Sequence, residues 1–526
     1  MENGKWKMEN SNKSIIRNLF LIFNLAFLIS GAFAQEAPPA PSAPREVKIP
    51  AIQNSELPSG LRIAVVERKN VPLVTVSLLL NAAAAKGEAK DGLANTTASL
   101  LTKGTKTRTA TQIAEQIEFL GGNISARANW NSTVISVNVT SDKLEQAMAI
   151  MSDVVLNPTF APKEIELFKS QTNDELAVNL KQPGNLASFV ASRYTFGEHN
   201  AVGTPESLKA ITPADIAKFY RETYLPNRAV LIFAGDVSNE KAAELAKKYF
   251  GTWNKSKTSP TKIDAPQIPT TAMVKKLQGE PGKTTIGKIL VVDLPKSGQA
   301  AVTYAKKLGA GRVNCFEEKC QSDETFYPST VANTILGGGY SARLNAEIRI
   351  KQGLSYGAAS SLAARRDQTN LFARVQTKNE TAARVVELVA AEIERLGSGT
   401  AEETELTPRK LTLTGAFGNS LETTDGLASR LADLYTFGLS ADELNTYMMR
   451  VRNVSAAEVK KFASANLNGG DIIIVGDAQI FMDDLKKRFP AQKIEVIAAS
   501  DLDLNRDDLR KTKMADDKPK PKAKGK

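Results

Sequence analysis

The chain has 526 residues, of which 42% are hydrophobic and 24% charged, a composition that excludes a wholly disordered or fibrous protein. It contains two cysteines and one histidine, which excludes a disulfide scaffold and any metal site that needs two imidazole ligands. The first 34 residues carry +2 and the last 16 carry +5 of the net charge of +11, so only +4 remains for the 476 residues between them. The nearly neutral charge of these 476 residues argues against nucleic-acid binding, which needs a concentrated basic face.

Residues 1–34 have the features of a secretory signal peptide. Basic residues up to Arg17 precede the apolar stretch Leu19–Ile29, and Ala32–Ala34 forms a small-x-small cleavage site before Gln35. The apolar stretch is shorter than a bilayer span, so an uncleaved anchor is the less favoured alternative. No later segment is uninterruptedly apolar over the ~18 residues that a span needs. We expect export to a bacterial periplasm or beyond, with no stable membrane insertion.

An Ala/Pro-rich leader at 35–50 precedes a first series of strands and helices at 51–253, which are predicted from hydrophobic periodicity and from end signals. This series ends at the polar, proline-containing segment 254–271, which has no period and is predicted to be a linker. The predicted strands are Leu61–Val66, Val74–Leu80, Thr133–Val139 and Ala229–Ala234; the predicted helices are Leu93–Leu101, Ile113–Leu120, Leu144–Val155, Pro162–Leu180, one opened by the capping box Thr212–Asp215, and Lys241–Tyr249.

A second series occupies residues 272–490, and the charged segment 491–526 is predicted to be a disordered tail. An internal repeat relates the two series, because Ile211–Phe219 resembles Val454–Phe462, 243 residues later, and an apolar strand ending in Gly-Asp follows each. The chain is therefore predicted to contain two homologous domains of the α+β class. In the second series the predicted strands are Asn370–Thr377 and Ile472–Val475, and an amphipathic helix covers Ala382–Leu396 and ends at Gly397.

Four segments point to a known family when their order and spacing are taken together. They are Leu57–Arg62, Asp91–Ala94, Lys103–Thr105 and Leu336–Leu344. With the two Gly-Asp strand ends, they resemble the pitrilysin/insulinase/mitochondrial-processing-peptidase family of zinc peptidases over nearly all of residues 50–490. The resemblance implies two homologous domains, each an antiparallel-rich sheet covered by helices, in the LuxS/processing-peptidase-like metallohydrolase fold.

The zinc motif of this family is degenerate in the chain. Family members carry His-x-x-Glu-His directly after Gly-Leu-Ala, where Asn95 and Ser99 here replace the imidazoles and Ala98 replaces the general base. Glu175 lies where the resemblance places the third ligand. One carboxylate among small neutral side chains cannot hold catalytic zinc, so we expect no metal and no cofactor in this chain. Glu175 is then a helix-face residue left from an ancestral site.

Arg349 and Tyr356 are seven residues apart and match a pair of residues in the family. The resemblance implies that the two halves enclose a substrate chamber and that this pair lies across it from the zinc site of the other half. A guanidinium and a phenol can both donate hydrogen bonds to an oxyanion or to a substrate backbone. The alternative is a solvated Arg349 at a helix end and a Tyr356 that starts a core strand. The glycines of Leu336–Tyr340 are predicted to form a turn rather than a phosphate loop, because no Lys-Ser/Thr pair follows them.

The two cysteines and the one histidine each leave two interpretations open. In an oxidising compartment Cys315 and Cys320 most simply form a short disulfide, although two free thiols are the alternative. For His199, the only histidine of the chain, a structural role is favoured over a role as a metal ligand. A Ser-His-Asp triad would have to use it, and the chain has no Gly-x-Ser-x-Gly elbow.

The favoured function is a non-catalytic subunit of a secreted heterodimeric zinc peptidase. A homologous partner subunit would bind the zinc, while this chain would supply Arg349 and Tyr356 and help to bind unfolded or short peptides. The second function is a peptide-binding or scaffold pseudopeptidase of the cell envelope, as a homodimer and without a catalytic role. An autonomous hydrolase of another kind is the weakest of the three.

Overall fold

The computed structural model describes residues 49–81, 83, 90–253, 285–309, 311–316, 319–366 and 368–512. All of these residues lie in one compact unit, Val47–Lys526. The predicted signal peptide, nearly all of the predicted leader and the predicted linker lie outside the described residues. Among the helices that are described, none has the length and apolar character needed to cross a bilayer.

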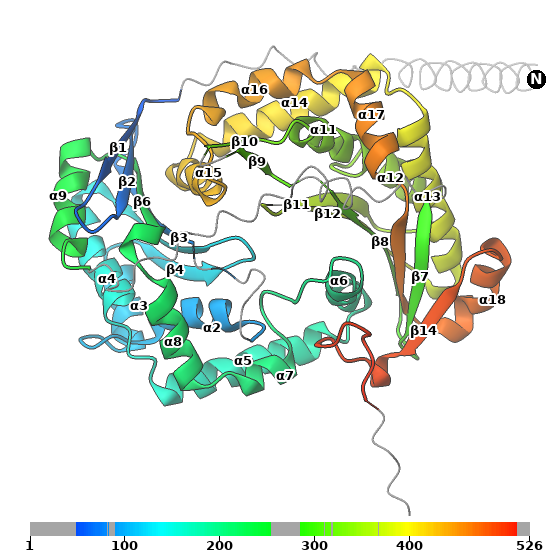
Figure 1. The fold of residues 1–526 in the computed structure, drawn as a ribbon, viewed down its shortest axis with the longest axis horizontal. Coiled ribbons are helices and arrows are strands. Elements are labelled where there is room, and N and C mark those ends of the chain that lie inside the picture. Colours follow the sequence, from blue (N-terminus) through cyan, green and yellow to red (C-terminus); the bar gives the residue numbers. More distant parts are fainter. Residues whose placement is uncertain are drawn as a thin grey trace, which may run out of the picture. The chain divides into compact units, whose positions relative to one another are not determined.

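The first half of the unit contains a six-stranded sheet in the order β1-β2-β6-β3-β5-β4 (Figure 1). Neighbouring strands are antiparallel except β2 and β6, which are parallel. Its strands and helices are β1 Ile52–Glu56, β2 Arg62–Glu67, β3 Leu73–Leu80, α2 Leu93–Leu100, η1 Leu101–Lys103, α3 Ala110–Phe119, β4 Asn123–Ala128, β5 Thr133–Thr140, η2 Ser141–Lys143, α4 Leu144–Leu156, α5 Pro162–Asn179, α6 Pro183–Tyr194, α7 Pro205–Ala210, α8 Pro213–Thr223, η3 Pro226–Arg228, β6 Ala229–Gly235 and α9 Asn239–Phe250.

The second half contains another six-stranded sheet, in the order β11-β12-β8-β13-β7-β14, and a two-stranded hairpin of β9 and β10. Its strands and helices are β7 Ile286–Asp293, β8 Ala300–Leu308, β9 Val313–Phe316, β10 Lys319–Ser322, α11 Phe326–Leu336, α12 Arg343–Asn345, η4 Ala346–Lys351, β11 Ala358–Ala364, β12 Thr369–Thr377, η5 Asn379–Thr381, α13 Ala382–Ser398, α14 Glu403–Ser420, α15 Thr424–Thr436, α16 Glu443–Asn453, α17 Ala456–Asn466, β13 Gly470–Gly476, α18 Ala478–Arg488, β14 Ile494–Ala498 and η6 Ala499–Asp501.

The two sheets have equivalent topologies, as the internal repeat predicts. Strands β2, β6, β3, β5 and β4 of the first sheet correspond in order to β7, β13, β8, β12 and β11 of the second. Both repeated segments begin with a capping box, in which the hydroxyl of Thr212 or Ser455 accepts the backbone N–H three residues on. The α+β class with two homologous, antiparallel-rich domains is confirmed.

Each sheet is covered on one face by helices of its own half and on the other by one helix of the opposite half. Helix α15 packs on strands β3 and β6 of the first sheet, and helix α6 packs on β8, β12 and β13 of the second (Figure 1). This exchange follows from strands such as β3, which is buried on both faces beyond Leu73 and therefore needs two apolar covers. The buried residues at the two exchanged contacts include Leu427, Ala428, Leu431 and Leu434 of α15 against Ala64, Val66, Leu79 and Ile232, and Leu186, Ala187, Val190 and Ala191 of α6 against Val292, Ala301, Ala305 and Ile473.

Polar contacts accompany this exchange. The Thr75 hydroxyl donates to the Asp425 carboxylate at 2.7 Å, and the Thr195 hydroxyl donates to Asp471 at 3.0 Å. Burying several leucines at ~1.5–3 kcal/mol each ties the two halves together.

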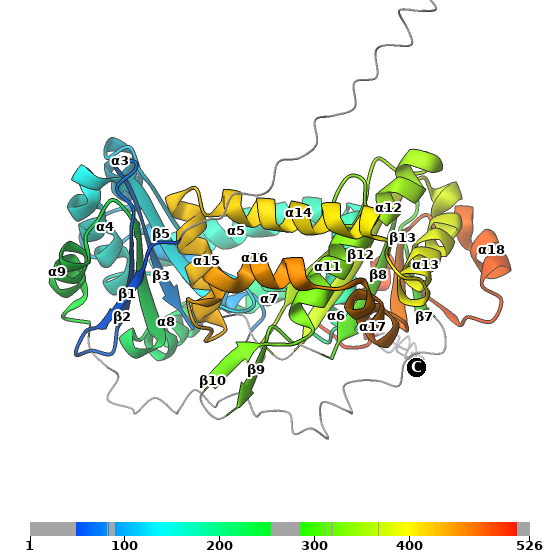
Figure 2. The same ribbon diagram turned by 90° about the horizontal axis from the view of Figure 1, so that it is seen from above.

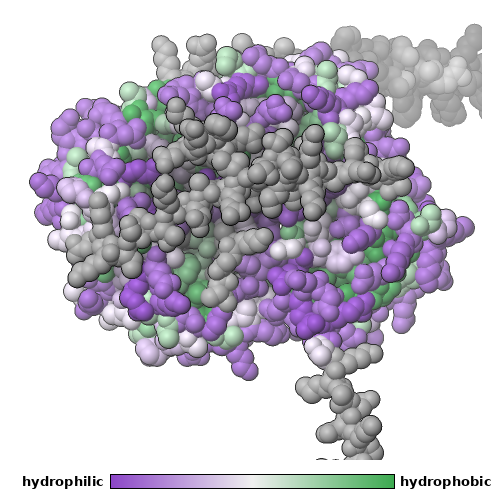
Figure 3. All heavy atoms as spheres, viewed as in Figure 1, coloured by the Kyte–Doolittle hydropathy of each residue, from purple (hydrophilic) through white to green (hydrophobic). Residues whose placement is uncertain are grey.

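In Figure 2 the long helix α14 runs alongside α16. The face drawn in Figure 3 is predominantly hydrophilic where described residues are in view.

Two predicted boundaries are wrong. The tail does not begin at 491, because β14 pairs in parallel with β7 and adds a strand to the second sheet. The short alternation of Ile494 and Val496 with charged neighbours was too brief to separate from the charged segment that follows. Helix α13 continues through Gly397 to Ser398, and its C-cap is Gly399. A glycine inside a helix is tolerated when packing supports it.

Candidate functional site

The degenerate zinc window lies on helix α2. The helix begins after Gly92, whose φ of 86° and close approach to Gly203 leave no room for a side chain, since a Cβ would lie 2.9 Å from the Gly203 Cα. Asn95 and Ser99 are half-buried, whereas Ala98 is completely buried and packs with Ala94 and Ala128. The position of the family's general base is therefore part of the hydrophobic core and out of reach of solvent.

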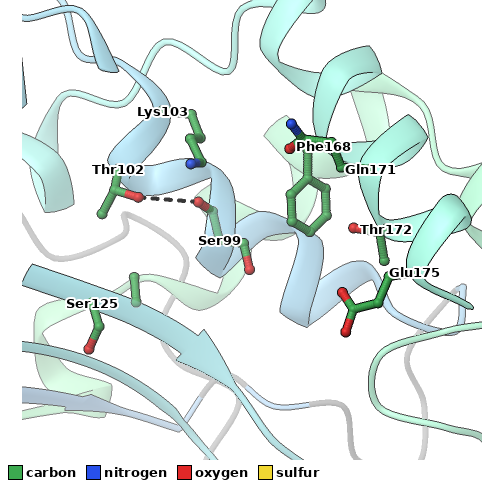
Figure 4. A pocket seen from close by; sticks show the side chains of 9 residues that line it. Ser99, Thr102, Lys103, Ser125, Phe168, Gln171, Thr172 and Glu175 are labelled. Carbon is green, nitrogen blue, oxygen red and sulfur yellow. Dashed lines mark hydrogen bonds between the residues drawn. The ribbon is translucent and has the colours of Figure 1, made fainter. Parts of the chain in front are cut away.

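Glu175, on helix α5, shares a pocket with Ser99. The pocket has a volume of about 400 Å³, and in Figure 4 the Glu175 carboxylate and the Ser99 hydroxyl lie close to the ring of Phe168. Asn95 and Ala98 do not line it. The structure thus brings together two of the four residues of the predicted degenerate site. The lining residues are Ser99, Thr102, Lys103, Ser125, Ala126, Phe168, Gln171, Thr172 and Glu175.

The donors of this pocket do not fit zinc. The pocket offers one carboxylate, several hydroxyls, one amide and one ammonium, and it contains neither histidine nor cysteine. Structural and catalytic zinc sites in proteins need at least three nitrogen, sulfur or carboxylate ligands. Within the described part of the chain, no group of three or more histidine, cysteine, aspartate or glutamate residues is placed to hold a metal.

His199 lies away from this pocket, in a polar cluster where the two halves meet. Its ring is 4.9 Å from the ring of Trp130, and its Nδ1 is 3.7 Å from the Asp91 carboxylate. The neighbouring Glu198 is buried and accepts hydrogen bonds from the Arg365 guanidinium at 3.1 and 3.2 Å. The structural role that its sequence context favours stays a prediction.

Arg349 and Tyr356 lie in the second half of the chain. Arg349 is half-buried in η4, and its guanidinium lies 5.0 Å from the centre of the Tyr340 ring. Tyr356 is 89% exposed and precedes β11, so the alternative that it starts a core strand is wrong. Neither residue lines the pocket around Glu175, whose walls all come from the first half.

The segments around this pair are held by local contacts. The Ser355 hydroxyl donates to the Gly357 carbonyl at 2.7 Å and accepts the Gly357 N–H at 3.0 Å, so it closes a turn around Tyr356. The predicted glycine turn also exists, and Gly337 packs so closely on β11 that a Cβ there would lie 2.2 Å from the Ser360 nitrogen. This close approach, rather than anion binding, explains a glycine at position 337.

Sequence reasoning missed Tyr340 and Phe168. Tyr340 was considered only as the end of the glycine turn, but it is 66% exposed and stacks with Arg349. Phe168 gave no signal beyond helical periodicity, yet it forms the aromatic wall of the pocket. The one signal that could have pointed to Tyr340 is its place directly after a glycine turn, with no hydrophobic neighbour in the sequence.

The two cysteines lie opposite each other in the hairpin of β9 and β10. The backbone register pairs Cys315 with Cys320 in an antiparallel ladder. Their side chains lie outside the described residues, so the disulfide stays a prediction.

Two protein-family models match consecutive parts of this chain. The model of the insulinase (M16) peptidase family matches residues 62–200, and the model of the M16 peptidase inactive domain matches residues 210–411. The chain belongs to the M16 peptidase family. Because its zinc window reads Asn-Thr-Thr-Ala-Ser, it is a member of the non-catalytic type.

Relatives and solved structures agree with this family membership. An uncharacterized zinc protease of Mycobacterium leprae is 27% identical over 383 residues, which are 71% of this chain and 80% of the relative. A probable mitochondrial-processing peptidase subunit beta of Arabidopsis thaliana is 24% identical over 228 residues, 41% of this chain and 42% of the relative.

Two solved structures share the M16 two-domain fold. An M16 peptidase inactive domain from Pseudomonas fluorescens has a TM-score of 0.70 at 24% identity and covers 81% of this chain and 98% of its own. A protease from Helicobacter pylori has a TM-score of 0.71 at 19% identity and covers 82% of this chain and 100% of its own. At these identities the likeness shows the fold alone.

Proposed function

We propose that this M16 chain is the non-catalytic subunit of a secreted two-chain zinc peptidase. A homologous partner subunit carries the zinc, and this chain supplies Arg349 and Tyr356 to the partner's active site. The substrates are unfolded or short peptides, because the resemblance to the family implies a substrate chamber that a folded protein does not enter.

The exposure of Tyr356 carries this proposal. Its side chain is 89% exposed on a turn closed by Ser355, and no hydrogen bond to a described residue engages its phenol. A tyrosine presented in this way is available to another molecule. The chain's own Glu175 pocket offers no use for it, because Tyr356 does not line that pocket and the pocket has only one possible zinc ligand.

The chemistry of peptide hydrolysis suits these two side chains. Attack of water on a peptide carbonyl builds negative charge on the carbonyl oxygen. The Tyr356 O–H and the Arg349 N–H groups can donate hydrogen bonds to that oxygen or to the substrate backbone. The partner's metal would activate the water, and this chain would lower the barrier by stabilising the oxyanion.

The names of relatives support a peptidase assembly. Those in Mycobacterium leprae and Bacillus subtilis are called zinc proteases, and the Arabidopsis thaliana relative is called a subunit of a processing peptidase. A chain of the same family that lacks the zinc ligands fits the complementary subunit of such an assembly.

Replacing Tyr356 by Phe tests the proposal in the pair purified from the exported fraction. Loss of one oxyanion donor should lower kcat by about 10²–10³, while gel filtration shows the same assembly. Tyr249→Phe, a hydroxyl deletion on helix α9, is the matched control and should leave kcat unchanged. An unchanged kcat in Tyr356→Phe would refute the catalytic role in trans.

A second candidate is a homodimeric peptide-binding or scaffold pseudopeptidase of the cell envelope; the Glu175 pocket, which has polar groups but no zinc site, supports only the binding part of it. Under this alternative the exported fraction would yield the chain with copies of itself and with no zinc-bearing relative. Co-purification with a relative that carries His-x-x-Glu-His would decide for the two-chain peptidase.

A further inference from the structure

A single buried side chain joins the two segments that carry Arg349 and Tyr356. Asn345, the last residue of α12, is only 4% exposed. Its Nδ2–H donates a hydrogen bond to the Tyr340 carbonyl at 2.6 Å, and its Oδ1 accepts the Ala358 N–H at 3.1 Å. These two hydrogen bonds, the Asn345 bridge, connect the end of the glycine turn to the first residue of β11.

The two partners of this amide require one orientation of it. A backbone carbonyl can only accept and a backbone N–H can only donate, so Nδ2 of Asn345 faces Tyr340 and Oδ1 faces Ala358. Both ends of the buried amide thereby have a partner. Neither an ionised aspartate nor a leucine of similar shape could make both bonds. Position 345 therefore needs a side chain that carries a donor and an acceptor a fixed distance apart.

The Tyr340 end of the bridge acts on Arg349. The ring of Tyr340 lies 5.0 Å from the Arg349 guanidinium, so fixing the backbone of Tyr340 fixes the surface against which the guanidinium stacks. Arg349 follows Asn345 by four residues on the π-helix η4, where the Gln352 N–H donates to the Glu347 carbonyl five residues back. Such helices are rare and occur frequently at functional sites. The bridge therefore joins directly onto the turn that directs Arg349.

The Ala358 end of the bridge acts on Tyr356. Ala358 begins β11 two residues after this tyrosine, and its bond to Asn345 holds the start of the strand. On the other side of the tyrosine, the Leu354 carbonyl accepts the Thr377 hydroxyl at 2.6 Å. Tyr356 is thus held by the backbone on both sides, while its own side chain is 89% exposed. A fixed backbone with a free side chain suits a group that is presented to another molecule.

We propose that Asn345 is a positioning residue, which sets the place of Arg349 relative to Tyr356. This inference rests on the function proposed above and adds to it a buried residue that itself contacts neither substrate nor metal. Two donors stabilise one oxyanion only when both are held within about 0.5 Å of the productive geometry. The Asn345 bridge meets this need, because a shift of one segment is transmitted to the other through one amide.

Hydrogen exchange of the isolated full chain tests the bridge itself. In Asn345→Ala the Ala358 N–H loses its acceptor, so exchange of this amide should become about 10-fold faster or more. Mass spectrometry of fragments that span residues 354–360 measures the change. Asn345→Ser, whose one hydroxyl cannot bond to both segments, is the milder variant and should change the exchange in the same direction.

Asn379 provides a matched control. It is also 4% exposed, its Nδ2–H donates to the Ser297 carbonyl at 2.8 Å, and its Oδ1 accepts the Asp477 N–H at 3.0 Å. It thus bridges two other segments of the second half, one before β8 and one after β13. Asn379→Ala removes an equivalent buried amide, but it should leave the exchange at Ala358 and the kcat of the pair as in the wild type.

In the two-chain peptidase the positioning should appear in kcat. Asn345→Ala should lower kcat by about 10–10² and change KM little, because it misplaces groups that act on the developing oxyanion. Combined with Tyr356→Phe, it should give clearly less than the product of the two single losses, since it acts in part through the tyrosine that is already altered. A purely structural role would multiply the two losses.

Three results would each overturn the positioning role. They are unchanged exchange at Ala358 in Asn345→Ala, a wild-type kcat of this variant in a pair that Tyr356→Phe impairs, and losses that multiply in the double variant. If Tyr356→Phe alone leaves kcat unchanged, the two-chain peptidase fails instead. The exchange measurement needs neither partner nor turnover, so the two failures are distinguishable.

Discussion

Ala98 occupies a place where a carboxylate would act in a zinc-bearing M16 peptidase. Its side chain is completely buried against Ala94 and Ala128, so this part of α2 is packed as core. In this chain position 98 is therefore surrounded by core side chains.

Ala98→Glu should lower the free energy of unfolding by about 3 kcal/mol, because it places a charge in the core without a partner. Ser99→Glu, one position on and half-buried at the pocket, is the matched control and should change stability by less than about 1 kcal/mol. Chemical denaturation of both variants measures the difference. Equal stabilities of the two variants would contradict the burial of position 98.

The residue types at the site could be predicted from the sequence, and their surroundings could not. The family motifs on either side fix the register of Asn95, Ala98 and Ser99, so the sequence alone predicts that the zinc ligands are absent at these positions. The exposure of Tyr356, its Ser355 turn and the Tyr340–Arg349 stack depend on how η4 and β11 meet in space. The packing of η4 against β11 leaves no periodic pattern in the sequence, so it could not be predicted from it.

At the scale of elements, Asp153 connects helix α4 to the loop that follows α2 and η1. Burial of the Asp153 carboxyl opposes its ionisation, but its hydrogen bonds outweigh this effect and hold its pKa below the ordinary value of 3.8. The donors are Thr105 at 2.5 Å, Thr107 at 2.8 Å, Arg108 at 2.7 Å and Asn157 at 3.0 Å.

A depressed pKa in the folded state gives a defined pH dependence. The ionised Asp153 contributes stability that is complete above the unfolded pKa and is lost as pH falls through the lower folded pKa. Asp153→Asn should therefore be less stable than the wild type by about 2 kcal/mol at pH 7, and the difference should shrink below pH ~4. Urea unfolding across this range measures it, with Asp174→Asn as an exposed control. A difference that does not vary with pH would contradict the role of the ionised carboxylate.

The elements that were predicted follow from local signals, but their assembly does not. The capping boxes at Thr212 and Ser455 and the alternation of β5 and β12 are local, and the predicted elements appear within a few residues of their places. Neither α6 nor α15 was predicted as a helix, and their exchange between the halves was not predicted either, because an amphipathic pattern does not specify which sheet a helix covers.

At the scale of the whole molecule, the repeat predicted two homologous domains, and the structure adds that they interlock. Each sheet needs a helix from the other half to bury its second face, so the halves are expected to fold as one unit. Strand β14 shows the limit of the repeat, because it adds in parallel where β1 of the first sheet adds antiparallel.

This chain lacks the ligand set of a hydrolytic zinc site, and the proposed function places it beside a subunit that has one. The most direct test is metal analysis of the purified chain together with cleavage of an unfolded peptide, with and without a chelator. We expect no stoichiometric zinc and no chelator-sensitive cleavage by the chain alone, and both on addition of the zinc-bearing partner. One zinc per chain with chelator-sensitive cleavage by the isolated protein would contradict it.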